Sequence, residues 1–164
     1  AAVGITPVVV VPQLKSRSIT VIAAMTNNLL NYRILDNYQS GNTERFAHYI
    51  DDLAAWRDAN DIHNAIVVLD NVPIHHSQEV TGILQDLGFE WHYLPPYTPY
   101  FQPIENLFSQ WKNLVKRQNP QTLPEIYAAM NQIQETITAD QLNNYVVKSR
   151  SNCQLYLTGT RQFE

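Results

Sequence analysis

The chain lacks the residues that several common kinds of protein require. Its single cysteine, Cys153, excludes an internal disulfide, and without a Cys/His cluster the chain cannot form a closed structural zinc site. Its five glycines do not cluster, so no glycine-rich loop cradles a phosphate. No Gly-x-Ser-x-Gly motif marks a serine nucleophile, and no apolar run is long enough to cross a bilayer. We therefore expect no membrane insertion and no small-molecule cofactor, and the lone cysteine fits a reducing, intracellular compartment.

A surplus of positive charge is also absent. The 164 residues carry 11 Lys and Arg against 15 Asp and Glu, which gives a net charge of −4. Bulk attraction would not hold this chain on DNA, so nucleic-acid binding would depend on a local patch, a metal ion or a partner segment. The hydrophobic content of 45% and the charged content of 16% are typical of a globular chain. Residues 1–164 are expected to form one domain.

The first half of the chain is predicted to contain strands around one helix. Val8–Val11, a β-branched run between prolines, is typical of an edge strand. The turn residues Thr26–Asn28 separate two apolar runs and predict a hairpin. Ala65–Leu69 is fully apolar and too short for a helix, which predicts a central strand covered on both sides. The elements expected here are strands at 19–25, 29–35 and 65–69 and a helix at 44–60, capped by Asn42 or Thr43.

The second half is predicted to be mainly helical. Ser77 is a candidate cap and Gly88 a stop signal for one helix, and Pro103 occupies the first position of another. The expected elements are helices at 78–87, 103–117, 124–137 and 141–148, a strand at 89–94 and a loose tail. A hairpin followed by alternating helices and strands indicates a mixed α/β sheet with helices on both faces.

Two acids follow these elements at positions typical of ligand sites. Asp70 ends the central strand, and open α/β sheets bind ligands at the carboxyl ends of their strands. Glu105 lies in the first turn of a helix, after a proline-rich loop. Two such carboxylates suit Mg²⁺ or Mn²⁺, and a metal pair about 4 Å apart could assist phosphodiester cleavage. Each acid also has a structural alternative, because Asp forms turns and a first-turn Glu complements the helix dipole.

The residues around these acids carry a resemblance to a known family. Residues 70–75 read Asp-Asn-Val-Pro-Ile-His, residues 94–99 read Leu-Pro-Pro-Tyr-Thr-Pro, and residues 103–105 read Pro-Ile-Glu. With 34 residues between the acids, these boxes resemble those of mariner-like DDE transposases, the Tc/mariner superfamily and its bacterial insertion-sequence relatives. Trp111 and Lys112 are similar to the family's downstream Trp-x-x-Lys-type helix.

The resemblance implies an RNase H-like fold and metal-dependent cleavage and strand transfer of DNA at transposon ends. Asp70 and Glu105 would be the second and third acids of a triad that holds two Mg²⁺ or Mn²⁺ ions. Asn71 and His75 would support Asp70 or contact DNA, with turn capping and helix-entry hydrogen bonding as the structural alternatives. Lys112 and Lys116, on the polar side of the helix with Glu105, could contact phosphates or form a solvated face. His76 is expected to be a surface residue.

The partners implied are transposon-end DNA and target DNA, with pairing of two catalytic domains in a homodimer. The compartment implied is the nucleus in a eukaryote or the cytoplasm in a bacterium. Site-specific recognition of the transposon ends would belong to an upstream helix-turn-helix module.

One part of the family pattern is missing. No carboxylate precedes Asp36, and we interpret Asp36 as a turn residue, so the first acid of the triad and its strand are not found. In one interpretation the chain is an N-terminally incomplete catalytic domain that is active in the full-length protein. In another it is an inactive RNase H-like remnant that acts as a DNA-binding or assembly module. A nuclease that cuts without joining is a third alternative.

Overall fold

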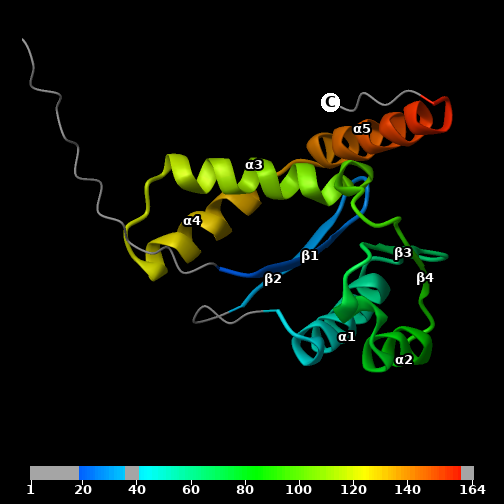
Figure 1. The fold of residues 1–164 in the computed structure, drawn as a ribbon. Coiled ribbons are helices and arrows are strands. Elements are labelled where there is room, and N and C mark those ends of the chain that lie inside the picture. The colour runs from blue at the N-terminus through cyan, green and yellow to red at the C-terminus, as the bar shows by residue number, and fades with distance from the viewer. Residues whose placement is uncertain (1–18, 36–40, 160–164) are drawn as a thin grey trace, which may run out of the picture.

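The structure is a computed structural model that describes residues 19–35 and 41–159 (Figure 1). The predicted strand at Val8–Val11 lies outside the described residues. In chain order, the elements are β1 (Val21–Met25), β2 (Leu30–Ile34), α1 (Thr43–Ala59), β3 (Ile66–Leu69), the 3₁₀ turn η2 (Pro73–His76), α2 (Gln78–Asp86), β4 (Glu90–Tyr93), the 3₁₀ turn η3 (Pro99–Phe101), α3 (Pro103–Arg117), α4 (Leu123–Glu135) and α5 (Ala139–Leu157).

The four described strands form two pairs. β1 and β2 make the predicted antiparallel hairpin, in which Val21 pairs with Ile34 and Met25 with Leu30. Its turn is closed by the Thr26 amide, which donates to the Leu29 carbonyl at 2.8 Å. β3 and β4 are parallel, from Ile66 beside Glu90 to Leu69 beside Tyr93. The described strands thus combine the two pairing modes of a mixed sheet, although β1 and β3 are not hydrogen-bonded to each other.

Helices pack on opposite sides of the hairpin, as the alternation of its side chains requires. Ile22 and Ala24 face a core formed by α1 and α2, in which Ile50 and Leu84 are almost fully buried. Val21 faces the other way, toward a second core built around Trp111 of α3 and residues of α4. Figure 1 shows this order, with α1 and α2 on one side of the strands and α3 and α4 on the other. The prediction of helices on both faces is confirmed for the hairpin.

The prediction that β3 is covered on both sides is wrong for the described residues. Val67 and Leu69 pack on the α1 and α2 core, but Ile66 and Val68 are 48% and 55% exposed. The cause is that α3 and α4 pack over the hairpin and leave the same face of β3 open. An apolar strand with one bare face is the main irregularity of the fold.

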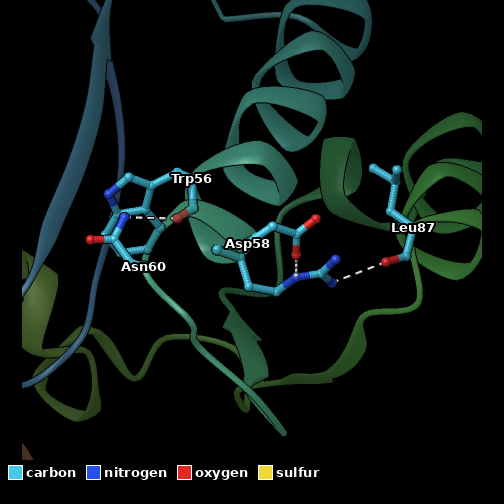
Figure 2. A network of polar contacts seen from close by, with 5 residues as sticks. Trp56, Asp58, Asn60 and Leu87 are labelled. Carbon is cyan, nitrogen blue, oxygen red and sulfur yellow. Dashed lines mark hydrogen bonds and ion pairs between the residues drawn. The ribbon is translucent and has the colours of Figure 1, made fainter.

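The C-terminal ends of α1 and α2 are joined by one arginine (Figure 2). Arg57 donates to the carbonyl of Leu87 at 3.0 Å and to the carboxylate of its neighbour Asp58 at 2.8 Å. Its guanidinium also lies 4.5 Å from the centre of the Phe89 ring. Gly88, with a φ of +70°, then turns the chain from α2 toward β4. This corner sets the end of α2 against the start of the strand that pairs with β3.

The last helix is longer than its sequence predicts. α5 extends to Leu157, where a short helix ending near Lys148 and a loose tail were expected. Asn and Ser residues lower the helix propensity of this stretch, but packing outweighs propensity because Ser149 and Asn152 are buried. A capping box at Thr138 and Gln141 fixes the start of the helix. None of the described helices combines the length and the apolar character that a membrane span needs.

Leu107 offers a direct test of the packing around α3. Its side chain is fully buried, so Leu107→Ala should lower the free energy of unfolding by about 2–5 kcal/mol in urea denaturation. Asn113→Ala, at an exposed position of the same helix, should change it by less than about 0.5 kcal/mol. Equal effects of the two substitutions would contradict this packing.

Candidate functional site

The two predicted acids line one cleft of about 590 Å³. Asp70 follows the last residue of β3, and Glu105 is the third residue of α3. The walls of the cleft include β1 from Val21 to Met25 and the stretch from Ala65 to Leu69. The structure therefore brings together two carboxylates from elements that are far apart in the sequence.

A stiff loop delivers Glu105 to the cleft. Proline fixes its own φ and restricts the residue before it, so Pro95, Pro96 and Pro99 leave this loop few conformations. The Thr98 hydroxyl donates to the carbonyl of Pro95 at 2.5 Å. The Gln102 amide donates to the carbonyl of Pro99 at 3.0 Å, which closes η3 immediately before α3. Pro103 then begins the helix, as its sequence predicts.

The two acids interact electrostatically. Burial raises the pKa of the Glu105 carboxyl, and the negative charge of Asp70 raises it further. Both acids line the same cleft, which accounts for the effect of the Asp70 charge on Glu105. The cleft thus keeps two like charges together, as a cation-binding site does before its cation is bound.

His75 contacts Asp70 from the turn η2. Its Nδ1 lies 2.7 Å from Asp70 Oδ1 and 3.2 Å from the backbone carbonyl oxygen of Asp70. The contact with Oδ1 is short but lacks hydrogen-bond geometry, so this buried oxygen has no hydrogen-bond donor. The Phe46 ring lies 4.4 Å from the imidazole, centre to centre, and limits its movement. The structure therefore places His75 where it can orient Asp70, while one carboxylate oxygen keeps its acceptor capacity for another group.

His76 contacts Asn71, which sequence reasoning missed. Its Nε2 lies 2.5 Å from Asn71 Oδ1, and its ring stacks on Tyr93 at 4.0 Å. The Tyr93 hydroxyl donates to the His75 carbonyl at 2.8 Å. His76 is exposed, as predicted, but it also holds Asn71 beside Asp70. This contact could have been predicted from the position of His76 in the turn after Asp70 and Asn71, because that turn folds back on the two residues.

The two lysines lie on exposed positions of α3. Lys112 and Lys116 follow Glu105 by 7 and 11 residues, which is close to two and three helical turns. They therefore share its side of the helix, about 10 Å and 16 Å farther along the axis at 1.5 Å per residue. The structure places neither lysine in the cleft, whose lining from α3 ends at Phe108.

The oxygen ligands that the cleft offers suit a hard divalent cation. Asp70 and Glu105 supply carboxylate oxygens, and Asp70 Oδ1 is buried without a hydrogen-bond donor. Within the described ranges, however, no three acidic, His or Cys side chains gather into a metal-binding group. A two-acid site of this kind binds a cation more tightly when a further oxygen ligand is added.

Sequence comparison identifies a family. The model of the DDE superfamily endonucleases matches residues 1–127, which is most of the chain. No curated protein matches the chain.

Solved structures similar to the chain include those of Mos1 transposase. The catalytic domain with raltegravir and Mn has a TM-score of 0.78 at 14% identity, over 89% of this chain and 77% of that chain. The catalytic domain of Mos1 mariner transposase has a TM-score of 0.78 at 15% identity, over 89% and 76%. The Mos1 transposase paired-end complex with left transposon end has a TM-score of 0.79 at 16% identity, over 89% and 45%.

These likenesses show the fold. The predicted RNase H-like fold is confirmed by the match to the catalytic domains. The chain spans about three quarters of those domains, but less than half of the Mos1 chain in the paired-end complex. The roles of individual residues remain predictions.

The raised pKa of Glu105 predicts a pH-dependent cost of burying this carboxyl beside Asp70. Because its folded-state pKa lies above the unfolded value, its ionisation destabilises the fold as pH rises through that range. In metal-free buffer, Glu105→Gln should therefore be more stable than wild type at pH 7, by at most about 1 kcal/mol for a partly exposed pair. The difference should vanish near pH 4, where wild type is protonated too.

The matched control is Glu79→Gln, in the first turn of α2, which should give no gain at pH 7 because it weakens a favourable helix-dipole interaction. Thermal unfolding from pH 4 to pH 8 measures both variants. Loss of stability in Glu105→Gln at pH 7 would contradict the electrostatic interaction.

Proposed function

Because the chain belongs to the DDE superfamily of endonucleases, we propose that it is most of the catalytic domain of a mariner-like DNA transposase. Its reaction would be hydrolysis of a DNA strand at a transposon end, followed by joining of the freed 3′-hydroxyl to target DNA. The observation that carries the proposal is the meeting of Asp70 and Glu105 in one cleft of a fold similar to the Mos1 catalytic domain.

In this proposal Asp70 and Glu105 hold two divalent metal ions, Mg²⁺ or Mn²⁺. When bound, such ions polarise the phosphodiester, activate the attacking oxygen and stabilise the leaving oxygen. The chain's own residues set the ligand geometry. His75 keeps Asp70 in one orientation, and His76 does the same for Asn71.

We also propose that the cleft receives a further strand with the third acid. The described strands pair only as the β1–β2 hairpin and the β3–β4 pair. Among the described residues, β1 and β3 therefore each have an unpaired edge, and both strands line the cleft. A strand between them would pair with both edges and complete one mixed sheet. A carboxylate on that strand would lie beside Asp70 and Glu105. The domain would then be completed by a segment that contains this strand.

DNA is the proposed substrate and partner. Several of the similar structures are Mos1 assemblies with a transposon end or transpososomes. In this chain, Lys112 and Lys116 extend from the Glu105 side of α3 and are proposed to contact phosphates. By the same analogy with the paired-end complex, two copies of the domain would act on two transposon ends.

Metal binding provides the first test. Wild-type protein should bind Mn²⁺ in calorimetric titration, and the Asp70→Asn, Glu105→Gln double variant should lose this binding because both carboxylates are removed. An Asp86→Asn, Glu44→Gln variant removes one Asp and one Glu carboxylate outside the cleft and should bind Mn²⁺ as wild type does. Equal Mn²⁺ binding by wild type and the double variant would remove the basis of the proposal.

The alternative function is an inactive assembly module, which the absence of a third acid among the described residues favours. The two functions differ when a strand with an Asp is supplied by a longer chain. The transposase should then nick a transposon-end duplex in Mn²⁺ and join a pre-nicked end to target DNA. An inactive module should do neither, and a nuclease should nick without joining.

Tyr97, in the loop that precedes η3, is predicted to stack on a DNA base. It is 97% exposed and has a φ of +61°, which is unfavourable for a bulky residue, so the loop presents an aromatic ring to solvent at a cost in stability. Tyr97→Gly should leave stability unchanged or raise it by less than about 1 kcal/mol. It should also weaken binding of single-stranded DNA by roughly 5- to 100-fold, the loss of one stacked base.

Tyr97→Phe, which keeps the ring, should bind DNA as wild type does. Fluorescence anisotropy with a labelled oligonucleotide measures affinity, and thermal unfolding measures stability. Unchanged DNA affinity of Tyr97→Gly would contradict stacking.

A further inference from the structure

A buried asparagine of α5 reaches the loop that precedes Glu105. Asn152 is 5% exposed, and its Nδ2 donates a 3.0 Å hydrogen bond to the backbone carbonyl of Tyr100. Tyr100 is the middle residue of η3, the turn that leads into α3. The two partners are 52 residues apart in the sequence. One side chain thus connects the C-terminal helix to the segment that delivers a candidate catalytic acid.

The polar character of residue 152 needs a specific reason. The buried side of α5 also includes Leu142 and Ser149, and an apolar residue is the usual occupant of such a position. Asparagine is a poor helix former, and a buried amide is costly unless it is hydrogen-bonded. The Tyr100 carbonyl supplies the compensating partner. The hydrogen bond to η3 therefore explains why a polar amide occupies this buried position.

The position of η3 is transmitted to Glu105 through the backbone. The Gln102 amide donates to the Pro99 carbonyl at 3.0 Å, and the Glu105 amide donates to the Gln102 carbonyl at 3.3 Å. Between Tyr100 and Glu105, Pro103 fixes its own φ and restricts Gln102 before it, which leaves fewer dihedral angles that could absorb a shift of Tyr100. A displacement of η3 would therefore also move the first turn of α3, which contains Glu105.

Two further contacts join α5 to the same region. The Tyr145 hydroxyl donates to Oε1 of Gln110, in the second turn of α3 after Glu105. The ring of Tyr156 lies edge-on to that of Phe101 in η3, with their centres 5.4 Å apart. Contacts of α5 therefore flank Glu105 along the chain, on η3 before it and on α3 after it. Helix α5 lies wholly beyond residue 127, where the family match ends.

We propose that Asn152 is a positioning residue, which holds η3 through the Tyr100 carbonyl and so keeps the Glu105 carboxylate beside Asp70 for metal binding. The effect on metal binding rests on the proposed function. The positioning of η3 does not, because it follows from the hydrogen bond between Asn152 and the Tyr100 carbonyl. Groups that orient a metal ligand are commonly worth 10- to 100-fold in metal affinity. Loss of the Asn152 amide should therefore weaken Mn²⁺ binding about 10-fold.

The first measurement is free of metal. Amide hydrogen exchange is compared for the full chain as wild type, Asn152→Ala, and Asn143→Ala, an exposed position of the same helix. Both substitutions raise helix propensity equally, so the two variants differ in the loss of a buried side chain and its hydrogen bond. Asn152→Ala should speed exchange at Gln102 and Glu105 by about 10-fold and leave α2 unchanged. Asn152→Leu, which fills the space without a donor, repeats the test if the alanine variant unfolds.

The second measurement separates positioning from general stabilisation. Mn²⁺ affinity is measured by calorimetry in a double-mutant cycle of Asn152→Ala and Glu105→Gln. If Asn152 acts through Glu105, its substitution should weaken Mn²⁺ binding about 10-fold in wild type but less than 2-fold beside Glu105→Gln. A merely structural role would give the same fold-change in both backgrounds.

The outcomes separate this inference from the proposed function. Unchanged exchange at Gln102 and Glu105 in Asn152→Ala, or equal loss of Mn²⁺ affinity in both backgrounds, would overturn the positioning role. If wild type bound no Mn²⁺, the proposed function would fail. Faster exchange in Asn152→Ala, confined to residues 99–105, would still support the positioning of Glu105 by Asn152.

Discussion

The fold holds two carboxylates, those of Asp70 and Glu105, in one cleft although their negative charges repel each other. Asp70 and Glu105 would separate in a flexible chain. Burial, and to a lesser extent the charge of Asp70, raises the pKa of Glu105, which reflects the cost of keeping this carboxyl in the cleft beside Asp70. One acid is fixed at the end of a parallel strand, and the other by a proline-stiffened loop and a helix whose core residues Leu107 and Trp111 are buried. Packing on both sides of the hairpin thus supplies the free energy that keeps an unfavourable pair in place, and a divalent cation would convert the repulsion into attraction.

Most element boundaries could be predicted from the sequence because they depend on local chemistry. Asn42 and Ser77 accept hydrogen bonds from the first turns of α1 and α2, Gly88 takes a positive φ, and Pro103 begins α3. These signals act over three or four residues, so they can be recognised without the tertiary structure. The two acids were identified in the same way, from an apolar strand that ends in Asp70 and a helix start that contains Glu105.

The features that the sequence did not predict depend on contacts between distant segments. Helix α5 continues through Ser149 and Asn152 because burial against η3 and α3 compensates for weak helix formers. His76 was expected only at the surface, yet it stacks on Tyr93 of β4 and holds Asn71. The bare face of β3 likewise results from where α3 and α4 pack, which no property of Ile66 or Val68 encodes. In each case the outcome depends on which distant segment packs, or does not pack, against the residue.

Within residues 19–35 and 41–159, no strand pairs with the outer edges of β1 and β3, and this affects how the chain behaves at high concentration. Unpaired backbone donors and acceptors beside exposed Ile66 and Val68 form a template for edge-to-edge association between molecules. Such pairing resembles the first step of amyloid growth, and it competes with any segment that belongs in the cleft. Stock solutions of this chain should therefore be kept dilute, and light scattering that rises with concentration would report strands of separate molecules pairing across the open edges.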